Sequence, residues 1–354
     1  MELASLLETC GDTTVLAATG ALVGFVFGLT AQRTRFCTRA AVIESCQGQL
    51  GPRFAVWWLG FSACWLAVQI LVMLGALQPQ TSRFIAPMGS ISGAVIGGLL
   101  FGAGMIMTRG CAGRLLVLSA NGNLRAVIAL LVFAVTVQAS IGGVLAPLRQ
   151  TLLAWWPIDG GAGRDLLQIS GWGRTGGLVL AALALASAVP LYLRQQPGRW
   201  GLGLCTLVVG LSVAAGWGLT QAIANQSFEA VAIQSISFSS ASAEFLMRLL
   251  SSGTAPRFGF DAGLLPATLV GSLLGALVGR EFKWESFQAE NKLGHYLTGA
   301  VLMGLGAVMA GGCTVGAGMA GGAIFSLTAW LTLLAIWLGA GLAWRVHRHM
   351  GWPV

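Results

Sequence analysis

The stretch that decides the fold runs from Ile91 to Cys111 and reads ISGAVIGGLLFGAGMIMTRGC. No charged residue interrupts it before Arg109, so it is long and apolar enough to cross the hydrocarbon core of a bilayer as a helix. It then ends in a short polar turn that contains glycine. This pattern predicts a membrane-spanning helix that stops abruptly, followed by a second element that begins at the cysteine.

The composition of the whole chain agrees with a membrane environment. Of its 354 residues, 56% are hydrophobic and 9% are charged, and the mean hydropathy is +0.78. Soluble domains carry about 25% charged residues, so this chain cannot cover a water-exposed surface. The formal net charge of +8 is spread over the ends of apolar runs and forms no basic arm, so nucleic acid is not an expected partner. We predict an all-α integral membrane protein in contact with the lipid bilayer.

Nine apolar runs are long enough to span a bilayer. Their approximate ranges are 13–31, 54–76, 88–108, 124–147, 174–193, 201–221, 262–280, 293–311 and 324–344. Four further segments are too short to span but too apolar for water-exposed loops. Broken backbone survives at membrane depth only where protein or a water-filled cavity satisfies it. We therefore predict four short re-entrant helices that line a pathway, near 35–47, 111–121, 225–250 and 313–323.

The positions of Lys and Arg predict the orientation. With the acidic N-terminus placed outside, fourteen of the 20 basic residues fall on the inner side. The positive-inside rule then predicts a periplasmic N-terminus and a cytoplasmic C-terminus. Nine spans agree with this, because an odd number places the termini on opposite sides.

The chain also contains an internal repeat. Gly102–Cys111 (GAGMIMTRGC) and Gly304–Cys313 (GLGAVMAGGC) share the pattern G-x-G-x-x-M-x-x-G-C, and Gly28–Thr30 recurs as Gly218–Thr220. We expect a single transmembrane domain with a first repeat over about 13–147, a connecting helix over about 174–193 and a second repeat over about 201–344. The odd number of spans between equivalents inverts the second copy, as in many transporters whose site lies between broken helices.

Three cysteines lie where a span stops and a short segment begins: Cys37, Cys111 and Cys313. Gly110 and Gly312 precede two of them, and a helix that starts at such a turn directs its positive dipole end toward an anion. A thiol there could donate an S–H hydrogen bond to an anion. The alternative is that these cysteines only pack, which is what we expect for Cys10, Cys46, Cys64 and Cys205. No C-x-x-C pair or histidine cluster is present, so we predict no metal or cofactor site.

Polar residues around these junctions are candidates for contact with an anion. Arg35, Arg109 and Arg114 flank Cys37 and Cys111, and intramembrane arginines usually face a cavity. Positive-inside anchoring is the alternative, and it is the expected role of Arg39 and Arg125.

Other polar groups in the short segments have two possible roles. Glu44 and Glu244 could neutralise the arginines. Ser235 and Ser237 belong to a hydroxyl-rich run, SISFSSAS, that either conducts the ion or satisfies broken backbone. The repeat assigns Asn225–Ser227 to the place of Arg35–Cys37. His347, in the basic C-terminal tail, is expected to meet lipid headgroups.

The sequence resembles the YeeE/YedE family of bacterial sulfur-compound transporters over essentially its whole length. The resemblance is carried by R-F-C at Arg35–Cys37, by Gly110-Cys111, and by AGGCTVGAG at 310–318. It implies an hourglass-like bundle in the bacterial inner membrane that takes up thiosulfate. It also implies that Cys37, Cys111 and Cys313 pass the ion along by S–H hydrogen bonds. In Thr108–Arg114, TRGCAGR replaces the more neutral turn of thiosulfate-transporting members, so another sulfur oxyanion or a selenium species stays open as the substrate.

Three functional classes are compatible with these features. A transporter of thiosulfate or a similar small sulfur anion, not an enzyme, is the leading hypothesis. The alternatives are a membrane sulfurtransferase that forms a persulfide on Cys111 or Cys313, and a channel subunit without sulfur chemistry. An enzyme would need a general base beside its thiol, and no histidine or carboxylate neighbours these cysteines in sequence. A small cytoplasmic sulfur-carrier protein is a further partner that the sequence leaves open.

Overall fold

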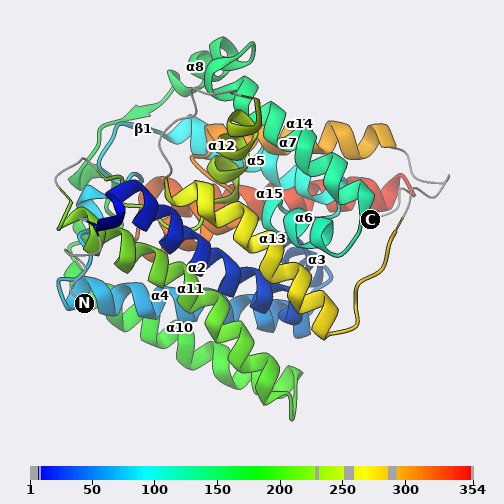
Figure 1. The fold of residues 1–354 in the computed structure, drawn as a ribbon, viewed down its shortest axis with the longest axis horizontal. Coiled ribbons are helices and arrows are strands. Elements are labelled where there is room, and N and C mark those ends of the chain that lie inside the picture. The colour runs from blue at the N-terminus through cyan, green and yellow to red at the C-terminus, as the bar shows by residue number, and fades with distance from the viewer. Residues whose placement is uncertain (1–6, 8, 228–230, 251–258, 286–292, 352–354) are drawn as a thin grey trace.

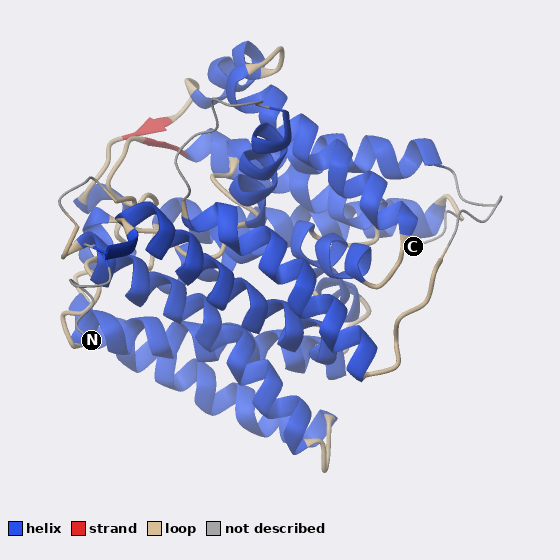
Figure 2. Cartoon of the chain, viewed as in Figure 1, coloured by secondary structure: helices blue, strands red, loops and turns tan. Residues whose placement is uncertain are grey.

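A computed structural model describes residues 7, 9–227, 231–250, 259–285 and 293–351. Within these residues, nine helices are long and apolar enough to cross a membrane, as predicted. They are α2 (Asp12–Thr34), α4 (Pro52–Met73), α5 (Ile91–Met107), α7 (Leu124–Gly142), α10 (Gly173–Gln195), α11 (Trp200–Ala224), α13 (Phe260–Val278), α14 (Leu293–Met309) and α15 (Leu327–His349). Figure 2 shows that helices make up nearly all of the regular structure, and with nine candidate spans the chain is an all-α membrane protein.

Each of the four short segments contains a short helix. These are α3 (Thr38–Cys46), α6 (Ala112–Ala120), α12 (Phe238–Leu250) and the π-helix η3 (Thr314–Gly321). The third is shorter than its predicted range of 225–250, because residues 225–227 and 231–237 are not helical.

The segment between α7 and α10 is also structured. It carries α8 (Ala146–Leu153), α9 (Leu166–Ile169) and the strand β2 (Pro157–Ile158). This strand pairs antiparallel with β1 (Gly89–Ser90), just before α5.

The long helices form two groups, one in the lower half of Figure 1 and one in the upper half. In the first group, α2 packs against α11 and α13, and α4 packs against α10 and α11. In the second, α5 packs against α14 and α15, and α14 packs against α7. The short helices contact both groups: α6 and α12 each pack against α7 and α13, α3 packs against α4 and α15, and η3 packs against α4, α11 and α15. The short helices thus form a middle layer.

Close backbone contact between α2 and α13 explains part of the high glycine content. A Cβ added to Gly28 would lie 2.3 Å from the carbonyl oxygen of Thr268, and one added to Gly263 would lie 1.9 Å from that of Ala17. Any larger side chain would force the two helices apart. Small residues at such seams let membrane helices approach closely.

The alternating direction of the long helices defines two faces. The N-terminal face carries Asp12 at the start of α2, together with the β1–β2 sheet and α8. The C-terminal face carries the ends of α2 and α5 and, at the end of α15, His349. In Figure 1, α2 begins on the left and α15 ends on the right. The start of the first span and the end of the last span therefore lie on opposite faces.

Candidate functional site

Each of the three junction cysteines directly precedes one short helix. Cys37 lies before α3, Cys111 before α6 and Cys313 before η3. Ser237 has the same place before α12, and its carbonyl oxygen accepts the N–H of Ala241 as the helix begins. Asn225 follows the end of α11 as Arg35 follows the end of α2. A longer non-helical segment then separates Ser227 from α12, so it is Ser237 that lies directly before the short helix, as Cys37 does.

A left-handed backbone turn precedes each of these cysteines by two residues. The φ angles are 51° at Arg35, 57° at Arg109 and 77° at Gly311. Glycine adopts this conformation freely, whereas it costs an arginine roughly 1–2 kcal/mol. The same turn thus recurs at three junctions. At two of them the residue is an arginine, which adopts this conformation despite the steric penalty of its Cβ.

The turns bring residues from four short segments together in the middle layer. The side chains of Cys37 and Cys111 act on each other, and the side chain of Thr314 acts on Cys111. Ser237 packs directly on η3, where a Cβ added to Gly316 would lie 2.7 Å from its Oγ. These contacts place Cys37, Cys111, Thr314 and Ser237 in one cluster.

Cys313 joins this cluster through its neighbour in the chain. Its side chain is fully buried, and its sulfur accepts the N–H of Gly316 at 3.4 Å, which caps the π-helix. The next residue, Thr314, has a buried hydroxyl that forms no well-aligned hydrogen bond with any described residue. Buried polar groups normally have a partner, so this hydroxyl has unused hydrogen-bonding capacity beside Cys111.

Two arginines on the C-terminal side of the cluster act on the thiols. Arg114 interacts electrostatically with Cys37 and Cys111, and Arg39 interacts with Cys37. Nη1 of Arg114 and Nε of Arg39 are buried without a described hydrogen-bond partner. Arg39 was expected only to anchor the chain. Its place in the first turn after Cys37, like that of Arg114 after Cys111, is the sequence signal that would have identified it.

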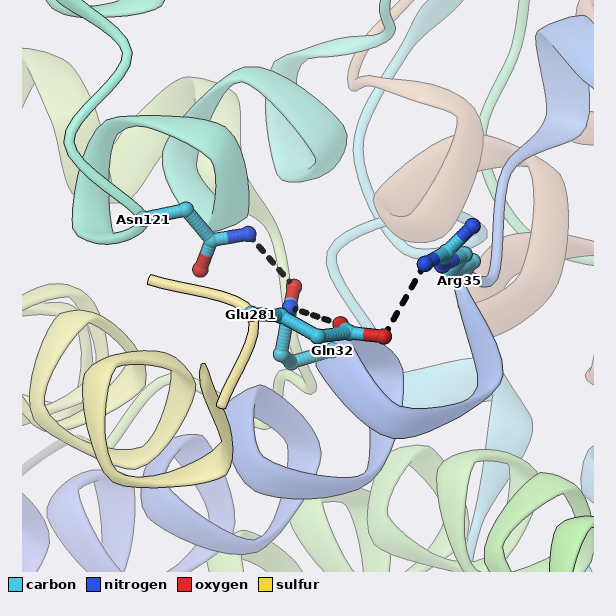
Figure 3. A network of polar contacts seen from close by, with 4 residues as sticks. All are labelled: Gln32, Arg35, Asn121 and Glu281. Carbon is cyan, nitrogen blue, oxygen red and sulfur yellow. Dashed lines mark hydrogen bonds and ion pairs between the residues drawn. The ribbon is translucent and has the colours of Figure 1, made fainter. Parts of the chain in front are cut away.

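Arg35 lies farther out and already has a partner. Its Nη2 donates to Oε1 of Glu281 at 2.9 Å, and both side chains are partly exposed. Figure 3 shows how this pair continues inward: Gln32 donates to Glu281 at 2.8 Å, and Asn121 donates to Gln32 at 2.9 Å. The network connects the end of α2 to the residues after α6 and α13. It therefore holds the C-terminal face together more than it offers Arg35 to an anion.

The expected neutralisation by Glu44 and Glu244 was wrong. Glu44 accepts the N–H of Phe54 at 2.8 Å, near the start of α4. Glu244 pairs with Arg248 one turn later on α12, at 2.7 Å. Both carboxylates are satisfied within their own neighbourhoods, so Glu281, which follows α13, takes the role beside Arg35.

Two further predicted residues have local contacts. Arg109 lies near Tyr296, with its Cζ 5.9 Å from the ring centroid. Ser235 donates to the carbonyl oxygen of Val213 at 2.5 Å, which satisfies backbone in the way that the alternative for the serine run expected. Of the two predicted serines, the structure brings only Ser237 to the cluster.

The sequence did not indicate a pair of histidines on the C-terminal face. Nε2 of His295 and Nε2 of His347 are 2.7 Å apart, and Nδ1 of His347 is 2.7 Å from the carbonyl oxygen of Ala343. His347 is buried, so the expectation that it meets lipid headgroups was wrong. The two rings connect the first turn of α14 to the last turn of α15.

The cluster is rich in hydrogen-bond donors and in positive charge. Thiols, a free hydroxyl and two arginines with unpartnered nitrogens can all donate to an anion, and no carboxylate is among the groups that act on Cys37 or Cys111. In the part of the chain that the structure describes, no three His, Cys, Asp or Glu side chains gather as metal ligands.

Comparison with known proteins agrees with this chemistry. A family model described as sulphur transport matches residues 33–342. The chain belongs to this family. It is 27% identical over 352 residues to the thiosulfate transporter TsuA of Escherichia coli (strain K12), covering 93% of both chains. It is 24% identical over 348 residues to the thiosulfate transporter TsuA of Spirochaeta thermophila, covering 94% of this chain and 99% of that one. The resemblance seen in the cysteine motifs is thereby confirmed, and this member of the sulphur-transport family aligns with both relatives almost from end to end.

Proposed function

We propose that the protein takes up thiosulfate across a bacterial inner membrane through the cysteine cluster. The observation that carries the proposal is the convergence of Cys37, Cys111 and Thr314 from three different short helices. Its relatives along nearly their full lengths are thiosulfate transporters. Packing alone would not require donors of this kind to meet in the middle layer.

The contacts give the pathway an order. From the N-terminal face the ion meets Cys313 and Thr314, then Cys111, then Cys37, and it leaves past Arg114 and Arg39. At each step an S–H or O–H group donates a hydrogen bond to an oxygen or sulfur atom of the ion. No covalent bond forms, so no thiol is oxidised and no reductant is needed. The delivered anion is then available to cytoplasmic partners such as a small sulfur-carrier protein.

The proposal includes an inverted repeat, which is supported by paired packing. If α2, α4, α5 and α7 correspond to α11, α13, α14 and α15, the contact of α2 with α13 becomes that of α11 with α4, and both contacts exist. Likewise α5 with α15 becomes α14 with α7, and α6 with α7 becomes η3 with α15. The left-handed turns at Arg109 and Gly311 are also equivalent. Such a repeat places the site at the midplane, between broken helices.

The same arrangement argues against the enzyme alternative. A persulfide-forming sulfurtransferase needs an activated thiol and a base that takes up its proton. The charged groups that act on Cys37 are arginines, which cannot serve as bases. We therefore propose a transporter that is not an enzyme, with its N-terminal face toward the periplasm and its C-terminal face toward the cytoplasm.

Uptake by the purified protein tests the proposal. Proteoliposomes that contain it should accumulate radiolabelled thiosulfate faster than empty liposomes, and an excess of unlabelled thiosulfate should compete. Unlabelled sulfate and selenite test the related anions in parallel. Uptake no faster than into empty liposomes, in either protein orientation, would overturn the proposed function.

A further inference from the structure

A cavity of about 570 Å³ lies on the N-terminal face, between the segment after α4, the β1–β2 sheet and the end of α14. Met309, Ala310 and Gly311 form part of its wall, and Gly312 and Cys313 follow directly in the chain. The cavity therefore adjoins the first cysteine of the pathway. Two arginines line it, Arg83 and Arg164.

Arg83 brings to this cavity a positive charge that has no close counter-ion among the described residues. Its Nε is buried without a hydrogen-bond partner, and its Nη1 donates only a long hydrogen bond to Gln234, at 3.4 Å. The guanidinium interacts electrostatically with Asp261 and Cys313. Among the residues that the structure describes, it forms no ion pair within 4.0 Å. An unpaired arginine inside a membrane protein usually marks a functional site.

Arg164 is fixed in the wall of the same cavity. Only 6% of it is exposed, and it donates to the carbonyl oxygen of Pro87 at 2.5 Å and to the hydroxyl of Thr328 at 2.7 Å. Its Nε has no described partner. Gly89 makes room for the guanidinium, because a Cβ there would lie 2.6 Å from its Cζ. Both partners of Arg164 are neutral, so its charge is held in place without being neutralised.

We propose that Arg83 and Arg164 form an anion-binding site in this cavity, which takes a tetrahedral sulfur oxyanion before the ion reaches Cys313. The site rests on the transport function proposed above and adds a binding step to it. The planar fork of arginine suits the oxygens of such an anion. Asp261 acts on Arg83, but Arg164 has only neutral partners, so the site keeps a net positive charge for an anion. The volume leaves room for part of the anion's hydration shell.

Binding to the purified full-length protein in nanodiscs tests the site, with thiosulfate as the probe. Arg83→Gln and Arg164→Gln should each raise the Kd by about 10-fold or more, as expected for a lost charge-assisted hydrogen bond. Arg174→Gln is the matched control, because Arg174 lies on the same face, is exposed and does not line this cavity. Unchanged affinity in both Arg83→Gln and Arg164→Gln would overturn the proposal.

Two further variants keep the test valid if Arg164→Gln folds poorly. Gly89→Ala preserves every charge but displaces the guanidinium of Arg164, so it should also weaken binding. Arg83→Lys keeps the charge without the fork, so its affinity should lie between those of the wild type and Arg83→Gln. Wild-type affinity in Gly89→Ala and Arg83→Gln together would contradict the site.

Separate outcomes concern the site and the transport function. Wild-type affinity for thiosulfate in the Arg83→Gln, Arg164→Gln double variant would overturn the site. Uptake with an unchanged KM in the Arg83→Gln, Arg164→Gln double variant would also overturn it, while leaving the transport function intact.

Discussion

The side chains of Cys37 and Cys111 act on each other, although they precede two short helices that are separated by α4 and α5. Both cysteines are free in the structure. Thr314 acts on Cys111, and Arg114 acts on both thiols. In the proposed pathway the two thiols are therefore consecutive donors to the anion.

Arg114 should matter more for transport than Arg125. Arg114 acts on both thiols and has an unpartnered buried Nη1, whereas Arg125 donates to the hydroxyl of Tyr296 at 3.1 Å. Arg114→Gln should reduce thiosulfate uptake by about 10-fold or more, which corresponds to a charge-assisted hydrogen bond of about 1.5–3 kcal/mol. Arg125→Gln should have a smaller effect. Uptake is measured in cells with matched amounts of folded protein, and equal effects would reduce both residues to topology signals.

The turn before Cys111 can be separated from the charge that it carries. Arg109 has a φ of 57°, which glycine adopts without a steric penalty. The free energy of unfolding of Arg109→Gly should therefore be about 1 kcal/mol higher than that of Arg109→Ala. Thermal inactivation followed by fluorescence-detected size-exclusion chromatography measures this difference. A glycine variant less stable than the alanine variant would mean that the left-handed turn is not adopted.

Alanine substitutions at two glycines should have opposite effects on stability, because only one of the glycines lies where α2 packs on α13. Gly28→Ala should destabilise the protein by about 1–3 kcal/mol, the usual cost of overpacking, because the new Cβ would lie 2.3 Å from the carbonyl oxygen of Thr268. Gly201→Ala in α11 meets nothing within 4 Å, so it should be neutral or stabilising. The same thermal assay compares them. A stable Gly28→Ala variant would show that the two helices are not in backbone contact.

Reporter fusions test the orientation. A fluorescent protein fused after Val354 should be fluorescent, and alkaline phosphatase at the same place should be inactive, because the basic end of α15 is predicted to be cytoplasmic. Active phosphatase there would reverse the proposed direction of the pathway.

The sequence predicted the long helices and the junctions because both are local properties. Apolar length is enough to place a span, and the glycine turn before Cys111 and Cys313 marks where it stops. It could not predict which polar groups meet across the middle layer. In the structure Glu281, not Glu44, pairs with Arg35. Ser237, not Ser227, lies directly before the short helix α12.

Those partners depend on how the chain packs, over large sequence separations. His347 shows the same limit, since a basic tail and a buried ring paired with His295 look alike in the sequence. Arg83 and Arg164 line one cavity, and nothing in the sequence shows that they meet there.

The most direct test of the cysteine pathway is thiosulfate uptake by serine variants. Ser keeps about the volume and a donor but removes the polarisable sulfur, so the packing should be preserved. Cys37→Ser, Cys111→Ser and Cys313→Ser should each reduce uptake per folded protein strongly, whereas Cys10→Ser and Cys205→Ser should not. Mass spectrometry after turnover should find no persulfide on the three pathway cysteines. Wild-type uptake by the triple Cys37, Cys111 and Cys313 serine variant would contradict the account.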